Sequence, residues 1–390
     1  MNRHSSIYTL MLAFLLFSCG DFVELSKTAE EQEVKIYGDI FNQKVVDGVL
    51  FDDNTYLLSG NSTLLNYRAS LLIRVDASAE LVSYKHLESE GDHNSINSLL
   101  NVSESQTVYA CGDIGNGDTL RLGLWNVNES TLETQKLYAS PLSLVNKVSG
   151  VDVIRSQDAH LYTLGNIFST DVNDSEFLLS KIEEATSNVI WEKVYGFDQT
   201  EDVAQNLFET LDGDLVIVGT TLFNGFLSPR IIKLNSYGDI IWDRIISRQA
   251  SELQGSRLSA SINEYGLITL VSRKDNGEHY LTKVSSSQGD IVTNNLISTA
   301  ETSGSSVTYS INHLSRDVNF QYFLLGKTLD EENSQMLMMS VQDNGQVTAF
   351  NTWGGLNNDE GVKYFPETKW VLTNLEMSDK GMVGMIKNTN

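Results

Sequence analysis

The sequence predicts an all-β protein, a β-propeller of seven four-stranded antiparallel blades. Apolar strands that end in a small residue recur seven times, and their last residues are at 60, 112, 165, 219, 272, 326 and 374. The steps between them are therefore 52, 53, 54, 53, 54 and 48 residues. Each unit contains four strand-like segments separated by turn residues, and no long window has helical periodicity. Four antiparallel strands in a repeat of this length are typical of a propeller blade.

The unit at 201–246 shows the four segments most clearly. Strands are predicted at 202–210, 215–221, 230–235 and 240–246. Turn residues separate the first two strands at Leu211-Asp-Gly-Asp214 and the last two at Ser236-Tyr-Gly-Asp239. Third strands alternate apolar and polar residues, which places a cation at the same position in four units. We expect these cations to be solvated or paired residues on a strand face: Arg74, Lys181, Lys233 and Lys283.

The two ends of the chain together complete one blade. The last unit has predicted strands at 361–368, 370–379 and 382–388, and then the chain ends without a fourth. The N-terminal segment Glu33-Val-Lys-Ile-Tyr-Gly38 closely matches Glu192-Lys-Val-Tyr-Gly196, which is a fourth strand. The sequence therefore predicts that an N-terminal strand closes the ring in a 3+1 clasp. Six blades with an additional hairpin is the alternative.

The first twenty residues have the features of an export signal. A short basic start, Met1 to His4, precedes an apolar run from Ile7 to Phe17. As a helix this run is about 16 Å long, roughly half the thickness of a bilayer core, so it is predicted to be a signal peptide and not a membrane span. It ends in Leu16-Phe17-Ser18-Cys19-Gly20, which resembles the lipobox of bacterial lipoproteins. The resemblance implies cleavage before Cys19 and acylation of that cysteine, with palmitate among the chains; a coincidental cysteine in an ordinary signal peptide is the alternative.

This organisation divides the chain into three parts. They are a lipoprotein signal peptide at 1–18, an acylated tether at 19–32 and the β-propeller domain at 33–390. Gly20, Asp21 and Glu24, after the cysteine, resemble the acidic export tag of Bacteroidota surface lipoproteins. The pattern Gly238-x-x-x-Trp242, together with Gln199-Thr-Glu-Asp202, resembles a bacterial propeller repeat that is common in uncharacterised secreted and lipid-anchored proteins. The resemblance implies a lipid-anchored protein of the outer membrane. Whether it faces the periplasm or the cell surface stays open.

Composition excludes several classes of partner. The chain has 27 Lys and Arg against 51 Asp and Glu, a net charge of −24. Because phosphate binding needs clustered cations, nucleic acids and anionic headgroups are not expected partners. Only two cysteines are present, and Cys111, in the apolar run Val108-Tyr-Ala-Cys111, is predicted to be a buried small hydrophobe.

Motifs for catalysis or for cofactors are absent from the sequence. It contains no G-x-S-x-G, H-E-x-x-H, Walker loop or C-x-x-C, so no catalytic residue and no cofactor is predicted. One segment between the first two blades gathers side chains that zinc or calcium can bind. A solvated loop is the alternative, so no metal is predicted and the segment supplies only weak candidates: His86, Glu88, Glu90, Asp92 and His93.

Two functions of different classes fit these observations. The first is a non-enzymatic binding or scaffolding module of the cell envelope, which would contact the lipid bilayer through acylated Cys19 and hold an unknown protein or glycan. The alternative is a surface glycan-degrading enzyme, a glycosidase or a lyase, with its site at the mouth of the propeller channel. That enzyme needs two carboxylates within about 5–10 Å of each other, and Asp47, Asp152 and Asp202 are the candidates. Aromatic residues could stack on a sugar or peptide, or instead pack between blades: Tyr195, Phe197 and Trp353.

Overall fold

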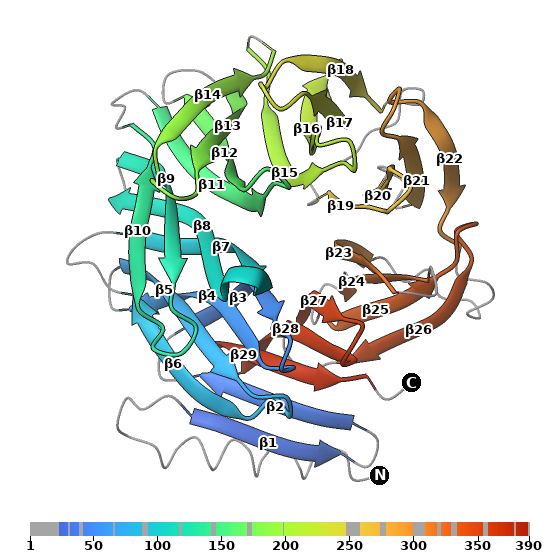
Figure 1. The fold of residues 1–390 in the computed structure, drawn as a ribbon. Helices are drawn as coiled ribbons and strands as arrows, with labels where there is room; N and C mark the ends of the chain where they lie inside the picture. Colours follow the sequence, from blue (N-terminus) through green and yellow to red (C-terminus); the bar gives the residue numbers. More distant parts are fainter. Residues whose placement is uncertain are drawn as a thin grey trace.

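The computed structural model is a ring of seven antiparallel sheets around a central axis (Figure 1), which confirms the seven-bladed β-propeller and excludes six blades. The first strand of each blade lies nearest the axis and the fourth lies at the rim. The structure describes residues 23–29, 32–38, 42–64, 67–87, 93–116, 119–141, 146–169, 174–197, 199–246, 258–273, 278–298, 309–317, 321–328, 334–353, 358–377 and 380–388.

The first six blades follow one another along the chain. Blades 1 and 2 consist of β3 (Asn42–Leu50), β4 (Tyr56–Leu64), β5 (Tyr67–Val75), β6 (Leu81–Leu87), β7 (His93–Val102), β8 (Thr107–Asn116), β9 (Thr119–Val127) and β10 (Thr134–Ala139). Blades 3 and 4 consist of β11 (Asn146–Arg155), β12 (His160–Ser169), β13 (Ser175–Glu183), β14 (Val189–Tyr195), β15 (Asp202–Glu209), β16 (Leu215–Phe223), β17 (Phe226–Leu234) and β18 (Ile240–Ile245). Blades 5 and 6 consist of β19 (Ser259–Ile262), β20 (Leu267–Arg273), β21 (His279–Ser285), β22 (Ile291–Leu296), β23 (Tyr309–Arg316), β24 (Tyr322–Thr328), β25 (Met336–Val341) and β26 (Val347–Trp353).

The seventh blade combines both ends of the chain. Its strands are β27 (Glu360–Phe365), β28 (Trp370–Met377), β29 (Lys380–Lys387), β2 (Gln32–Gly38) and β1 (Val23–Ala29). The strand β2 pairs with β29 through the residue pairs Val34–Ile386 and Tyr37–Val383. The strand β1 then pairs with β2 as a fifth, outermost strand. A strand therefore lies within the segment 19–32, for which the sequence predicted only a tether.

The strand β2 makes the same contacts as a fourth strand elsewhere in the ring. In blade 3, the hydroxyl of Tyr195 donates to the carbonyl of Gly238 at 2.8 Å, and the Lys193 ammonium pairs with Asp239 at 2.7 Å. In blade 7 the corresponding Tyr37 donates to the carbonyl of Ala79 and Lys35 pairs with Glu80. In both cases a fourth strand is tied to the turn between the third and fourth strands of the next blade.

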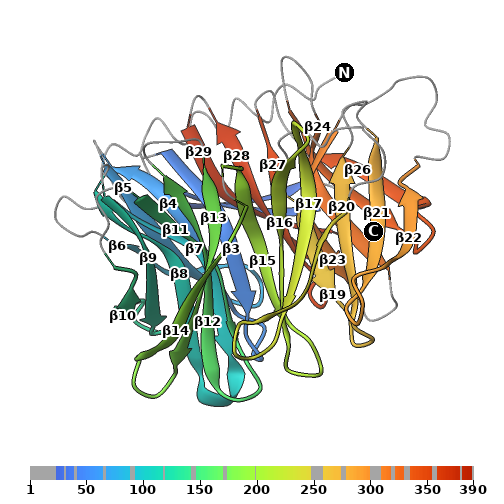
Figure 2. The ribbon, with the colours of Figure 1, turned by 90° about the horizontal axis from the view of Figure 1, so that it is seen from above.

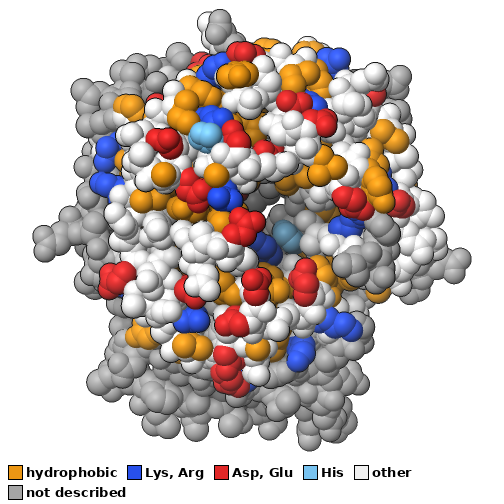
Figure 3. All heavy atoms as spheres, in the orientation of Figure 1, with side chains coloured by type: hydrophobic (Ala, Val, Ile, Leu, Met, Phe, Trp, Pro, Cys, Tyr) orange, Lys and Arg blue, Asp and Glu red, His pale blue; other side chains and the backbone are white. Residues whose placement is uncertain are grey.

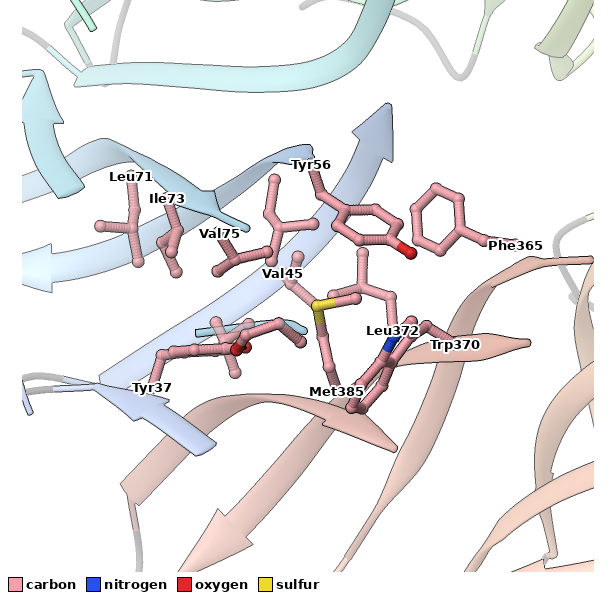
Figure 4. Packing of buried hydrophobic residues seen from close by; sticks show 13 residues of the cluster. Tyr37, Val45, Tyr56, Leu71, Ile73, Val75, Phe365, Trp370, Leu372 and Met385 are labelled. Carbon is pink, nitrogen blue, oxygen red and sulfur yellow. Dashed lines mark hydrogen bonds between the residues drawn. The ribbon is translucent and has the colours of Figure 1, made fainter. Parts of the chain in front are cut away.

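Apolar packing between neighbouring blades closes the ring. The described residues form seven clusters of buried side chains, one for each pair of adjacent blades. Figure 4 shows the cluster between blades 7 and 1, where Tyr37, Val45 and Trp370 surround Met385. The rings of Tyr56 and Phe365 meet edge to face, with centroids 5.1 Å apart. Each large apolar side chain buried in this way contributes roughly 1.5–3 kcal/mol to folding.

Among the described residues, one hairpin turn recurs seven times on the same face of the ring. In each copy the N–H of the first residue donates to the carbonyl of the fifth, and the N–H of the fourth donates to the carbonyl of the first. The fourth residue always has a positive φ, between 57° and 84°. The copies are 51–55, 76–80, 156–160, 210–214, 235–239, 263–267 and 342–346. We call the face that carries them the turn face; hairpin turns lie along its edge at the bottom of Figure 2.

The second and third strands of blade 4 are longer than the sequence suggested. They extend to Phe223 and begin at Phe226, so only Asn224 and Gly225 connect them. Both connecting residues have a positive φ, 53° and 84°, which is the backbone that a two-residue hairpin needs. The Asn-Gly pair was the signal for this turn.

The strand-face lysines are buried and paired. Lys181, Lys233 and Lys283 are each less than a tenth exposed. Each ammonium lies within 3.1 Å of a carboxylate on the turn face, and the partners are Asp158, Asp214 and Asp343.

Cys111 is a fully buried free thiol. Burial, together with the charges of Asp152 and Asp113, raises the pKa of Cys111 well above its usual value. This environment agrees with the expected small buried hydrophobe. Among the described residues, no helix has the length and hydropathy required to cross a membrane.

Candidate functional site

A ring of polar side chains surrounds the axis. In the first strands of six blades, β3, β7, β11, β15, β23 and β27, the pairing with the second strand skips one residue, which marks a β-bulge. The residue after the bulge is polar in every case, and Ser259 occupies the same register in β19. We call the seven residues at this register the axial ring: Asp47, Ser98, Asp152, Asn206, Ser259, His313 and Lys363.

The side chains of the axial ring tie together six of the seven pairs of neighbouring blades. Four of them accept a backbone N–H from the following blade, at 2.7–3.2 Å; the pairs are Asp47 with Leu99, Asp152 with Leu207, Asn206 with Ala260, and Ser259 with Leu314. Two further links join side chains directly. The Ser98 hydroxyl donates to Asp152 at 2.9 Å, and the Lys363 ammonium donates to Asp47 at 2.7 Å.

His313 is the exception in the axial ring. Its Nε2 atom is buried and has no hydrogen-bond partner among the described residues. Burial lowers the pKa of His313 to about 3, and the nearby Lys363 charge acts in the same direction. The imidazole is therefore neutral at physiological pH. Figure 3, which looks onto the turn face, shows a hollow at the centre with histidine, basic and acidic side chains beside it.

The environment of Asp152 in the axial ring changes its pKa. Burial raises the pKa of Asp152 to about 6, and the charge of Asp47 adds to the rise. Hydrogen bonds from Leu207, Ser98 and Val153 oppose the rise without cancelling it. The acceptor atoms of this carboxylate are thus occupied by groups from blades 2, 3 and 4.

Replacing Asp152 should remove a defined part of the pH dependence of stability. The folded chain keeps this carboxyl protonated up to about pH 6, whereas the unfolded chain releases the proton near pH ~4. The free energy of unfolding therefore falls as the pH rises past about 4 and about 6, by roughly 3 kcal/mol in total from this group. Urea unfolding of wild type and Asp152→Asn at pH 4.5, 5.5, 6.5 and 7.5 should show this component in wild type alone. Parallel curves for the two proteins would contradict the assignment.

Asp202 lies outside the axial ring. It is fully buried, and Arg230 (2% exposed) donates to it at 2.9 Å and to Asp243 at 2.7 Å. The ring of Phe197 stacks on this guanidinium, with its centroid 3.9 Å away. The N–H of Phe197 and the hydroxyl of Thr200 donate to the same Asp202 carboxylate. Asp202 is therefore a partner of a buried arginine and does not join Asp47 and Asp152.

A further carboxylate on the second strand of blade 2 also bridges blades. Asp113 accepts hydrogen bonds from the hydroxyls of Ser95 and Ser149, at 2.8 and 2.7 Å, and from the N–H of Gly150 at 3.0 Å. Asn166 and Asn374, at the same place in blades 3 and 7, bond to the backbone of Ala204 and Val45. The carboxylates of the inner strands thus hold the ring together.

The remaining predicted residues divide between packing positions and parts that the structure does not describe. Tyr195 belongs to the cluster between blades 3 and 4, and Trp353 packs against the cluster between blades 6 and 7, so both pack between blades. His86 lies in β6 with its ring 6.0 Å from that of Tyr84. Residues Cys19, Glu88, Glu90 and Asp92 and the side chain of His93 lie outside the described part. In the described ranges, no group of three or more His, Cys, Asp or Glu side chains is placed to hold a metal ion.

Five members of the axial ring were missed from the sequence: Ser98, Asn206, Ser259, His313 and Lys363. The signal for them was the repeat itself, since the seven positions are 51, 54, 54, 53, 54 and 50 residues apart. The residue types differ from blade to blade, so a search for one residue type does not find them.

Comparison with known proteins shows the fold alone. No protein-family model matches the sequence, and no curated protein sequence does. The polysaccharide lyase Uly1 is 9% identical with a TM-score of 0.53, over 91% of this chain and 92% of that one. The Dos1 propeller is 12% identical with a TM-score of 0.53, over 94% and 92%. At identities this low, a seven-bladed β-propeller is what these likenesses establish.

Proposed function

We propose that the protein is a non-enzymatic binding or scaffolding module of the cell envelope. The observation that carries the proposal is an uneven distribution of exposed apolar side chains. Sixteen large hydrophobic side chains are exposed among the described residues, and fourteen of them lie between Phe168 and Leu296, in blades 3–5. The other two, Val82 and Tyr84, are in blade 1. Exposed apolar surface gathered on one side of a soluble domain is typical of an interaction site.

The position of this surface agrees with attachment through acylated Cys19. That residue is four positions before β1 in the sequence, and β1 is the outermost strand of blade 7. In Figure 1 the strands β1 and β2 lie at the bottom of the ring, and β14 to β18 lie at the top, on the opposite side. A lipid anchor at Cys19 would hold blade 7 near the outer membrane and leave blades 3–5 for a protein or glycan partner. The module would act on either the periplasmic or the outer side of that membrane.

The axial ring also favours binding over catalysis. The carboxylates of Asp47 and Asp152 are each occupied by hydrogen bonds or an ion pair between blades. An acid–base pair that acts on a glycan needs oxygens that can reach the substrate. One observation favours the alternative, a glycan-degrading enzyme: Asp152, with a pKa of about 6, and the neutral His313 share the axial ring, and the lyase Uly1 has a similar fold.

Cross-linking in intact cells tests the anchored binding module. Wild type should fractionate with the outer membrane, incorporate an alkyne analogue of palmitate and give one reproducible cross-linked partner. Cys19→Ser should lose the label and the membrane association and recover less of that partner, because the acyl chains contribute about 0.8 kcal/mol for each buried CH₂. The absence of any reproducible partner for wild type would overturn the proposal.

An activity assay of the purified wild-type protein tests the alternative function, a glycan-degrading enzyme. Purified wild type is incubated with a panel of polysaccharides, and both new reducing ends and the absorbance of unsaturated products are followed. Depolymerisation that Asp152→Asn or His313→Ala abolishes would establish the enzyme and contradict the binding module. We expect no turnover by any of the three proteins.

A further inference from the structure

The seven equivalent turns of the turn face differ at their third residue. This residue is at the tip, directly before the residue with positive φ. In chain order it is Asp53, Ser78, Asp158, Asp212, Tyr237, Tyr265 and Asn344. Asp, Ser and Asn suit a turn because their short polar side chains bond to nearby backbone. Tyrosine has no such advantage, so the turn itself does not account for Tyr237 and Tyr265.

Both tyrosines project into solvent. Tyr237 is 73% exposed and Tyr265 is 74% exposed, the two highest values among the exposed large hydrophobic side chains. The next is Leu211, 71% exposed, in the first turn of blade 4. The turns of Leu211 and Tyr237 belong to blade 4 and that of Tyr265 to blade 5, so all three are on the turn face of adjacent blades. Because they are mostly exposed, the side chains of Tyr237, Tyr265 and Leu211 contribute little to the packing of the fold.

The backbone beneath each tyrosine is fixed. In the turn of Tyr237, the side-chain oxygen of Asn235 accepts the N–H groups of Tyr237 and Asp239, at 3.0 and 2.9 Å. In the turn of Tyr265, the side-chain oxygen of Asn263 accepts the N–H groups of Tyr265 and Leu267, both at 2.9 Å. A side chain on a fixed backbone loses little conformational entropy when a partner covers it, and tyrosine has few rotatable bonds. The two turns thus present preorganised aromatic side chains.

Charge indicates the chemistry of the partner. The chain has a net charge of −24, and acidic side chains are spread over the turn face in Figure 3. Asp212, Asp239 and Glu264 are in the same three turns as the exposed apolar residues. Asp239 pairs with Lys193 at 2.7 Å and Glu264 with Arg316 at 3.4 Å, whereas Asp212 has no ion pair among the described residues. Lys or Arg side chains are attracted both to carboxylates and to the faces of tyrosine rings. A basic partner therefore complements this surface, and an acidic one does not.

We propose that Tyr237 and Tyr265 are contact residues for a basic segment of a protein partner. Guanidinium or ammonium groups of that segment stack on the two rings and pair with Asp212, while its apolar residues cover Leu211. The inference rests on the proposed binding function and names the class of partner and the surface that it uses.

Peptide binding to the full chain tests the inference. The probe is a fluorescent twelve-residue peptide that alternates Arg and Ser, and its charge-reversed twin alternates Glu and Ser. The double variant Tyr237→Ser/Tyr265→Ser replaces each tyrosine by the residue that Ser78 supplies in the equivalent turn. The matched control, Ser78→Ala/Asn344→Ser, changes two equivalent turn tips without changing the charge. We expect the tyrosine variant to bind the basic peptide at least tenfold more weakly than wild type, and the control to bind it within twofold of wild type. The acidic twin should bind to none of the three proteins.

Two results would overturn the inference. Equal binding of the basic peptide by wild type and the tyrosine variant would mean that net charge alone attracts it. Binding of a neutral hexasaccharide that the tyrosine variant loses would make the two tyrosines a glycan platform instead. The cross-linking experiment separates this failure from that of the proposed function: a tyrosine variant that still captures the wild-type partner contradicts only the tyrosine surface, whereas a wild type without any partner contradicts the binding module.

Discussion

A chain that starts at residue 42 should melt at least about 10 °C below the full chain, whereas a chain that starts at residue 32 should melt within a few degrees of it. The first truncation removes both β1 and β2, and the second removes only β1. Loss of β2 removes the fully buried Tyr37 from the cluster between blades 7 and 1, and it unpairs the edge of β29. Deleting one buried aromatic side chain alone costs about 3–5 kcal/mol.

Thermal unfolding followed by circular dichroism measures both truncations. A synthetic peptide of residues 32–38, added to the shorter chain, should raise its melting temperature with increasing concentration, because binding to the folded state alone is stabilising. Two truncations that melt together with the full chain would show that β2 does not close the ring. The chain that starts at residue 32 is the matched control, since it differs only by the strand that closes the ring.

Asp202→Ala should cost about 3–5 kcal/mol of unfolding free energy, because it leaves the buried Arg230 charge with one carboxylate in place of two. The N–H of Phe197 and the hydroxyl of Thr200 lose their acceptor in the same variant. Asp212→Ala, on an exposed turn of the same blade, is the control and should change the stability by no more than about 0.5 kcal/mol. Urea midpoints at pH 7 provide the comparison.

A second variant separates charge from packing at this site. Asp202→Ala/Arg230→Met removes both members of the buried pair and should recover most of the lost stability, because replacing a buried ion pair by apolar groups is often neutral. If the double variant is as unstable as Asp202→Ala, the unpaired arginine is not the cause of the loss. The site would then depend on the hydrogen bonds that Asp202 accepts from Phe197 and Thr200.

The seven blades and the order of their strands could be predicted because each blade repeats a local pattern of apolar strands and tight turns. The missing last strand and the match between 33–38 and 192–196 indicated how the ring closes. The strand β1 was not predicted, because its segment is polar and acidic and it pairs only with the edge of β2. That pairing comes from tertiary context, which single-sequence patterns do not contain.

Of the three aspartates that the sequence suggested for the channel, Asp47 and Asp152 lie in the axial ring and Asp202 does not. Asp202 is the first residue of β15, whereas Asp47 and Asp152 are the sixth and seventh residues of β3 and β11, and the β-bulge determines which residue reaches the ring. In blade 4 the skipped residue is Gln205, so the ring position is Asn206, and Asp202 lies at the beginning of the strand. Because one extra residue reverses the direction of the side chains that follow, the site could not be placed before the bulge was known.

The pairing of β2 with β29 also determines when the protein can finish folding. Val34 and Ile386 are 386 − 34 = 352 residues apart in the chain. Blades 1 to 6 need only contacts within about 50 residues and can form as the chain emerges, whereas the seventh must wait for the C-terminus. Until then the edge of β2 that faces β29 is unpaired, and the C-terminal strands of another copy could occupy it. Synthesis at high concentration should therefore favour exchanged dimers over closed monomers.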